Sequence, residues 1–221
     1  MTLSLVFMFL MMAVVVWWLF HQVFAKPWAT QGAIEDVHAA STAAIPSIKV
    51  GFWVFLAVIT SMFSLFGSAY YMRMQLSDWI PLNEPTILWY NTGLLVLSSV
   101  AMQWTRRAVY SGHIEQLKLG VIVSGVISIV FLVGQIIAWR NLNEAGYFLT
   151  TNPANAFFYL LTALHGIHLL GGLLVWCKTA VKLFRGVAVL AELRLSIELC
   201  TTYWHYLLLL WLALFALMLS T

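Results

Sequence analysis

Six runs of mostly apolar residues, each long enough for a membrane-spanning helix, constrain the fold of this chain more than any other feature. A helix needs about 20 such residues to cross the hydrocarbon core of a bilayer. Only 9% of the 221 residues are charged, whereas a soluble domain carries roughly 25%, so a soluble domain is excluded. The sequence therefore predicts an all-α, polytopic membrane bundle with six transmembrane helices. The expected spans are residues 3–24, 50–72, 87–104, 117–139, 155–177 and 198–219.

Lysine and arginine are spread unevenly over the links between these spans. The second and fourth links carry only Arg73 and Arg140. Because cytoplasmic links hold the excess of basic residues, we expect the odd-numbered links in the cytoplasm and both termini on the outer, periplasmic side of a bacterial inner membrane. The basic residues form no block, which gives no reason to expect a nucleic-acid partner. Those in the odd-numbered links are Lys26, Lys49, Arg106, Arg107, Lys118, Lys178, Lys182, Arg185 and Arg194.

Sequence signals place the limits of two elements more closely. The run at 3–24 has no basic residue before it and no small-residue cleavage site, so we expect a retained helix rather than a signal peptide. The longest polar stretch follows it and is expected to form a cytoplasmic link over 26–47. Before the fifth span, Asn152 or Thr151 is a suitable N-cap, and Pro153 suits the first helical turn.

Histidines deep in the fifth and sixth spans are the main candidates for function. His165 and His168 are three residues apart and therefore share a helix face. At about 1.5 Å per residue, His168 lies roughly 20 Å below the outer end of its span and His205 about 12 Å above the inner end of the sixth, so both fall in the inner half of the membrane. Glu198 precedes His205 by two turns on the same face. Ionisable groups at such depth are functional candidates.

Three interpretations of these side chains remain open from the residues alone. In the first, His168 and His205 are the axial ligands of a haem, as in a b-type cytochrome. In the second, Glu198 and the histidines form a proton relay. In the third, the chain has no redox centre, and its polar groups pack helices and bind lipid headgroups. Small residues beside the histidine pair favour the third interpretation, because they let another helix approach closely.

Four stretches of the sequence resemble subunit III of the haem–copper terminal oxidases, the cytochrome c and quinol oxidases of respiratory chains. FFYLLTALHGIHLLGGLLV (157–175) is similar to the family's F-F-x-x-T-G-x-H-G-x-H-V-x-x-G, and ELCTTYWHYLLLLWLALF (198–215) to E-x-x-x-x-Y-W-H-F-x-x-x-x-W. Weaker matches lie at 51–71 and 91–109. The expected organisation is an extra N-terminal transmembrane helix over 1–25, the link over 26–47, and a five-helix bundle resembling the family over 48–221.

The resemblance implies a subunit without haem or copper, packed against catalytic subunit I and the other subunits of an oxidase that reduces O2 to water and translocates protons. Haem and copper are then expected in the partner subunits, phospholipid on this chain, and a respiratory supercomplex as a further partner. The implied role is to support assembly and sustained proton uptake, with activity belonging to the complex rather than to the isolated chain. The residues that match the family's motifs outside the histidine pair include Asn91, Thr92, Ser98, Ser99, Tyr203 and Trp204.

Three departures from the family argue against proton conduction by this chain. Positions at which many members carry a carboxylate are Ile59, Ala138 and Leu208 here. We therefore expect a structural polar cluster between the fifth and sixth spans, lipid headgroups bound at helix ends, and no catalytic or metal-binding residue. The cluster residues are His165, His168, Glu198 and His205, and the lipid-binding residues are Arg106, Arg107 and Lys178. An accessory subunit of a nitric oxide reductase and a b-type cytochrome remain as alternative functions.

Overall fold

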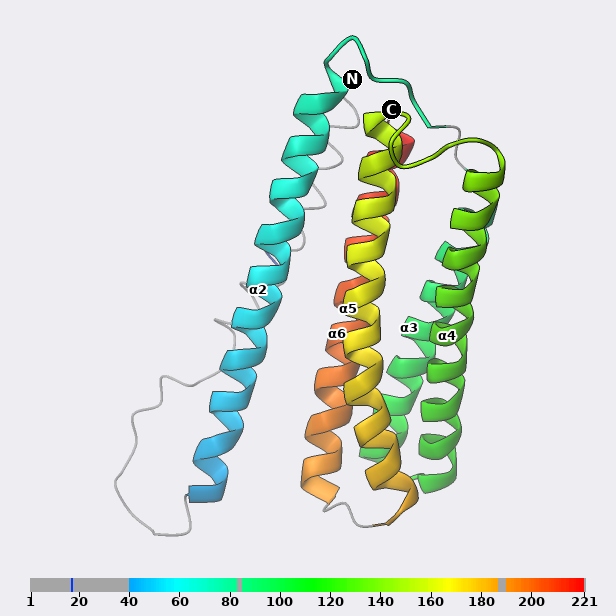
Figure 1. The fold of residues 1–221 in the computed structure, drawn as a ribbon. Coiled ribbons are helices and arrows are strands. Elements are labelled where there is room, and N and C mark those ends of the chain that lie inside the picture. Colours follow the sequence, from blue (N-terminus) through cyan, green and yellow to red (C-terminus); the bar gives the residue numbers. More distant parts are fainter. Residues whose placement is uncertain (1–16, 18–39, 83–84, 187–189, 221) are drawn as a thin grey trace. The chain divides into compact units, whose positions relative to one another are not determined.

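A computed structural model describes residue 17 and residues 40–82, 85–186 and 190–220 of the chain. Within these ranges the regular structure is entirely helical, which confirms the predicted all-α class (Figure 1). The expected span over 3–24 lies outside the described residues, apart from residue 17. The helices are α2 (Ala40–Met74), α3 (Ile87–Ser111), α4 (Ile114–Glu144), α5 (Pro153–Phe184) and α6 (Leu190–Leu219).

Four of the five described helices contain a segment long and apolar enough to cross a membrane. These segments are Ile48–Met74, Ile114–Glu144, Pro153–Phe184 and Glu192–Leu219. Helix α3 is not among them, although the sequence predicts a span over 87–104. Its buried side chains explain the difference, because several of them are polar and face neighbouring helices rather than lipid.

The chain divides into two compact units, residues 1–69 and 70–221. In the second unit α3, α4, α5 and α6 form a four-helix bundle in which each helix contacts the next and α6 contacts α3 (Figure 1). Only Gly112 and His113 separate α3 from α4, so the two helices are antiparallel neighbours. Gly112 has φ of 75°, in the left-handed region that glycine adopts without strain, and it ends α3.

Helix α5 begins as the sequence predicts. The Asn152 side chain accepts a hydrogen bond from the backbone N–H of Ala154 at 3.1 Å, and Pro153 occupies the first turn. This arrangement satisfies a backbone donor that the helix itself cannot pair. Helix α2, in contrast, begins at Ala40, so the end of the segment expected to be a link over 26–47 is helical.

Candidate functional site

Helix α3 buries a row of polar side chains along one face. Asn91, Ser98 and Thr105 are spaced by two helical turns, and each is at most 1% exposed. Such groups are costly in an apolar interior unless they are hydrogen-bonded. Thr105 bonds to its own helix, at Ala101 O, whereas Asn91 and Ser98 pair with side chains of α4.

Ser98 lies where three helices meet. Its hydroxyl is 2.7 Å from the hydroxyl of Ser128 on α4, and Ser128 donates to the backbone carbonyl of Ser124 at 2.8 Å. The indole N–H of Trp204 on α6 lies 3.0 Å from both serine hydroxyl oxygens, measured from Nε1. One indole therefore links α6 to both α3 and α4.

His205 also turns toward α3. Its Nε2 lies 3.2 Å from the amide oxygen of Gln103, and its Nδ1 is hydrogen-bonded to the hydroxyl of Ser99. Because an amide oxygen only accepts, Nε2 carries the proton, and Nδ1 of the neutral ring accepts from Ser99. Both ring nitrogens are thus used within the α3–α6 contact.

A second group of bonds joins α3 to α4 and α6 near the start of α3. Asn91 donates to the side-chain oxygen of Gln135 on α4 at 3.3 Å, and Trp211 on α6 donates to the hydroxyl of Thr92 at 2.9 Å. The motif residues Asn91, Thr92, Ser98 and Ser99 therefore each bond to a neighbouring helix. Chemically, this face of α3 can hold helices together, because its polar groups are used in bonds to α4 and α6.

His165 has a different environment. It is completely buried, and its ring lies against two aromatic side chains, Phe131 of α4 at 6.0 Å and Trp211 of α6 at 5.0 Å between centroids. Neither ring nitrogen has a hydrogen-bond partner in the part of the chain that the structure describes. The side chain is therefore packed as an aromatic group while its polar atoms remain unpaired.

His168 marks the contact between α5 and α6. Its Nδ1 is 2.7 Å from the carbonyl of Leu164 in its own helix, and its backbone carbonyl accepts from the Tyr203 hydroxyl at 2.9 Å. Tyr203 packs on Gly172, where an added Cβ would lie 2.7 Å from the ring. The absence of a side chain at Gly172 allows the tyrosine to reach α5.

Two of the four residues expected in the polar cluster have surroundings other than the expected ones. His165 has no hydrogen-bond partner among the described residues, and His205 directs both ring nitrogens to α3 rather than to α5. Equal depth in the membrane does not fix the direction in which a side chain points around its helix. A contact of His168 with Glu198, which is half-buried on α6, stays a prediction.

Metal ligation by these residues has little support in their geometry. Within the described ranges, no group of three or more His, Cys, Asp or Glu side chains is arranged to hold a metal ion. A haem between His168 and His205 would require His205 to give up its bonds to Ser99 and Gln103. The donor set of this chain therefore does not fit a haem at that position.

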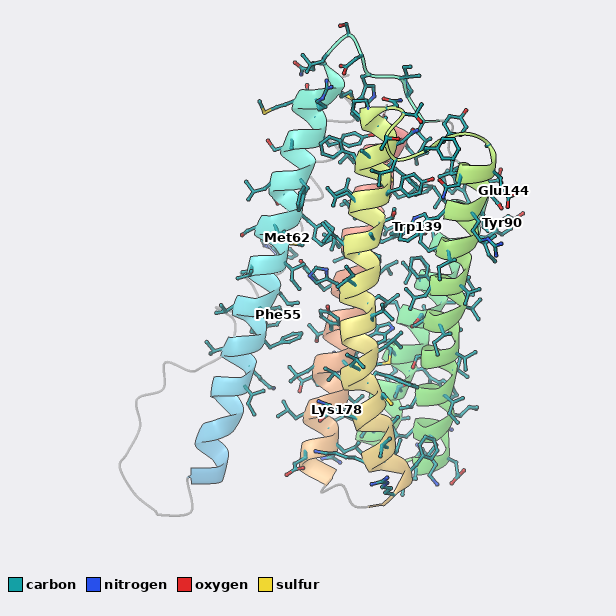
Figure 2. All side chains as sticks on the ribbon, in the orientation of Figure 1. Phe55, Met62, Tyr90, Trp139, Glu144 and Lys178 are labelled. Atoms are coloured by element: carbon teal, nitrogen blue, oxygen red, sulfur yellow. The ribbon has the colours of Figure 1, made fainter. Side chains whose placement is uncertain are left out.

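The basic residues expected to bind lipid differ in exposure. Arg106 is half-buried, whereas Arg107 and Lys178 are exposed. Figure 2 shows Lys178 toward the end of α5 that lies opposite to Glu144 at the end of α4. Lipid binding by these three residues stays a prediction.

Several residues that bond to the motif residues were not predicted from the sequence. Gln103, Ser124 and Ser128 were not singled out, although each bonds to one of the motif residues or to its partner. One signal was present: Ser124 and Ser128 are one turn apart in an otherwise apolar span, so both lie on the same face. Polar residues repeated on one face of such a helix indicate contact with another helix rather than with lipid.

The loop before α3 is attached to the start of α5. The side-chain amide of Asn152 is hydrogen-bonded to the backbone carbonyl of Ile80. Tyr70, Trp79 and Phe157 pack edge to face, with centroids 4.9 Å and 5.5 Å apart around Tyr70. The Arg73 guanidinium, in the last turn of α2, donates to Asp78 of this loop with an Nη1–Oδ1 distance of 2.6 Å. This bond holds the pKa of the Asp78 carboxyl below its usual range.

Comparison with known proteins identifies the family. The family model described as "Cytochrome c oxidase subunit III" matches residues 1–220, so the match also includes the N-terminal segment that the motifs left outside. The "Probable cytochrome c oxidase subunit 3" of Mycobacterium tuberculosis is 30% identical over 124 residues, which are 56% of this chain and 61% of that protein. The "Cytochrome c oxidase subunit 3" of Thermostichus vulcanus is 28% identical over 181 residues, covering 78% and 87% of the two chains.

A third relative, the "Cytochrome c oxidase subunit 3" of Synechocystis sp., is 27% identical over 178 residues, covering 78% of this chain and 75% of the relative. The match thus spans about three fifths of the Mycobacterium protein, at 61%, and a larger share of the other two. Because the family model covers almost the whole sequence, this chain belongs to the cytochrome c oxidase subunit III family.

Proposed function

We propose that this chain is a non-redox integral membrane subunit of a respiratory haem–copper terminal oxidase. Its complex would reduce O2 to water and translocate protons, with haem and copper in the partner subunits. Family membership supports the proposal. The observation that carries it is that the family-motif residues of α3 are engaged in bonds between helices, as in Ser98 with Trp204 and Ser99 with His205.

The proposed role is to stabilise the assembly and to sustain proton uptake by the catalytic subunit without conducting protons itself. A relay needs a continuous series of titratable groups or water. At two of the positions where family members carry a carboxylate, this chain has the buried apolar residues Ile59 and Ala138. Phospholipid headgroups are the proposed ligands of the basic helix ends at Arg106, Arg107 and Lys178.

In the proposed membrane arrangement the chain spans a bacterial inner membrane six times, with both termini outside. The organisation into an extra helix over 1–25, a link over 26–47 and a five-helix bundle over 48–221 belongs to this proposal. Helix α3 has 25 residues, and at about 1.5 Å per residue its length exceeds the hydrocarbon thickness of about 30 Å. Most of its buried polar side chains are hydrogen-bonded to other helices. These bonds lower the free-energy cost of placing them in the membrane.

Purification of the intact complex through a tag on this chain tests the function. Mass spectrometry of the co-purifying subunits should find an oxidase catalytic subunit, and copper should be present in the complex. Recovery of a nitric oxide reductase instead would assign the chain to that enzyme. An optical spectrum of the separated chain should lack a Soret band, since stoichiometric haem on it would establish the b-type cytochrome alternative.

A further inference from the structure

Two buried polar side chains in the middle of the four-helix bundle have unpaired atoms. Gln135 is 4% exposed; its oxygen accepts from Asn91, but its Nε2 has no partner in the described ranges. The same holds for both ring nitrogens of His165, which is fully buried. Buried polar atoms in native proteins almost always have a protein or water partner. Three nitrogens from two helices therefore require partners that the described protein does not supply.

The helix contacts place Gln135 one turn along α4 from the residue that meets His165. Helices α4 and α5 are antiparallel neighbours, and Phe131 of α4 meets His165 of α5. Two turns further along α4, Trp139 donates to Thr162 of α5 at 3.1 Å. Gln135 lies one turn from both Phe131 and Trp139, is buried on the same side of α4, and is bonded to Asn91 of α3. It is therefore a neighbour of the contact between Phe131 and His165.

The residue that follows His165 on α5 is half-buried and is not closely packed against α4. This residue is Gly166, and a Cβ added there would meet only one atom within 4 Å, Cδ2 of Leu132 on α4 at 3.9 Å. Thr162 is not the missing partner, because its hydroxyl is bonded to Phe158 O and to Trp139, and neither Gln135 Nε2 nor His165 bonds to it. A small ligand with both donor and acceptor capacity would complete the hydrogen bonds of Gln135 and His165.

We propose that ordered water binds between Gln135 and His165 at the centre of the bundle. A neutral imidazole has one donor and one acceptor nitrogen. One water molecule accepts from Gln135 Nε2–H and donates to the acceptor nitrogen of His165, and a second accepts from the ring N–H. Buried waters usually make about three hydrogen bonds to groups that would otherwise be unpaired.

This water site would connect α5 to α3. Gln135 is already bonded to Asn91, so the bridge would extend the contact from Asn91 through Gln135 and water to His165. The histidine pair then has a divided role, in which His168 contacts α6 through its backbone carbonyl and His165 holds water between α5 and α4. Water-mediated bonds of this kind are enthalpically close to direct ones.

A cryo-electron microscopy map of the intact complex, at a resolution that shows ordered water elsewhere in the protein, tests the proposal on the natural sequence. The expected result is a density peak within about 2.7–3.2 Å of Gln135 Nε2 and of a ring nitrogen of His165. A map in which both side chains contact only protein atoms, with no such peak, would overturn it.

Thermal unfolding of the full chain gives an independent test through Gln135→Leu, His165→Leu and the double variant. If water joins the two side chains, either substitution already breaks the bridge, and the double variant unfolds at nearly the same temperature as the less stable single variant. Asn91 loses its acceptor in both Gln135→Leu and the double variant, so this effect cancels. The control pair combines Gln135→Leu with Thr201→Val, whose hydroxyl bonds directly to Ile197 O, and should be additive. Additive effects of Gln135→Leu and His165→Leu would contradict the bridge.

Discussion

The indole of Trp204 on α6 donates to the hydroxyl of Ser98 on α3 with an Nε1–Oγ distance of 3.0 Å, and both side chains are buried. The same nitrogen lies 3.0 Å from the Ser128 hydroxyl on α4. Helices in a membrane gain little from the hydrophobic effect when they associate, so close packing and bonds of this type hold them together. Trp204 thus fixes three helices at one level of the bundle.

Replacing this tryptophan tests its bridging role. Trp204→Phe removes the indole donor and part of the ring volume, and should lower the free energy of unfolding by about 1–3 kcal/mol. Thermal unfolding of the chain in detergent measures the effect. Trp104→Phe on the exposed side of α3 (37% exposed) is the matched control and should change stability little. Equal effects of the two substitutions would contradict the bridge.

Two neighbouring glycines on α5 provide a test of helix packing. A Cβ at Gly172 would lie 2.7 Å from the Tyr203 ring, whereas a Cβ at Gly171 would meet nothing within 4 Å. Gly172→Ala should push α6 away and cost about 1–3 kcal/mol. Gly171→Ala should be neutral or slightly stabilising, because alanine has the higher helix propensity.

The same unfolding measurement compares the two alanine variants directly. A neutral Gly172→Ala variant, with the hydrogen bond from Tyr203 to the His168 carbonyl retained, would show that the α5–α6 contact is not limited by this glycine.

Depth along the bundle was predictable from the sequence, whereas direction around each helix was not. A helix rises by a fixed distance per residue, and His168 indeed meets Tyr203, two residues from His205, at 2.9 Å. The direction of His205 depends on how α6 packs, and its ring points toward α3 because Ser99 and Gln103 bond to it there.

The apolar runs predicted the described helices but made them shorter than they are. Helix α3, for example, continues past Arg106 to Ser111, since a helix does not stop where its hydropathy falls.

The N-cap of α5 was predictable because capping depends on local chemistry, and it leads to a further prediction. Asn152→Ala removes the acceptor for Ala154 N–H and the link to Ile80, and should cost about 0.5–2 kcal/mol. Thr151→Ala, one residue earlier and exposed, is the control, since the structure assigns the cap to Asn152. A larger loss for Thr151→Ala in thermal unfolding would show that the cap lies there instead.

Acid should weaken the ion pair between Arg73 at the end of α2 and Asp78 in the following loop. The bond from Arg73 lowers the pKa of Asp78 in the folded chain. A carboxyl with a lower pKa in the folded state stabilises the protein above its unfolded pKa, and this contribution is lost as the pH falls through the folded value. Part of the loss of stability below about pH 4 should therefore disappear in Asp78→Asn.

Unfolding midpoints recorded from pH 7 to pH 3 measure this effect. Glu144→Gln, which changes an exposed carboxyl at the end of α4, is the control. Parallel pH profiles for the natural chain and Asp78→Asn would mean that the ion pair does not contribute to stability in solution.

Substitution of His205 separates a packing role from a role at a haem. His205→Leu leaves the Ser99 hydroxyl and the Gln103 amide without their partner, and should reduce the stability of the chain by about 1–3 kcal/mol. If the histidine only joins α6 to α3, the amount of assembled complex falls, but the haem absorbance per assembled complex stays unchanged. His113→Gln in the exposed link between α3 and α4 should alter neither quantity. Loss of haem absorbance per complex in His205→Leu would show that this side chain serves a redox centre.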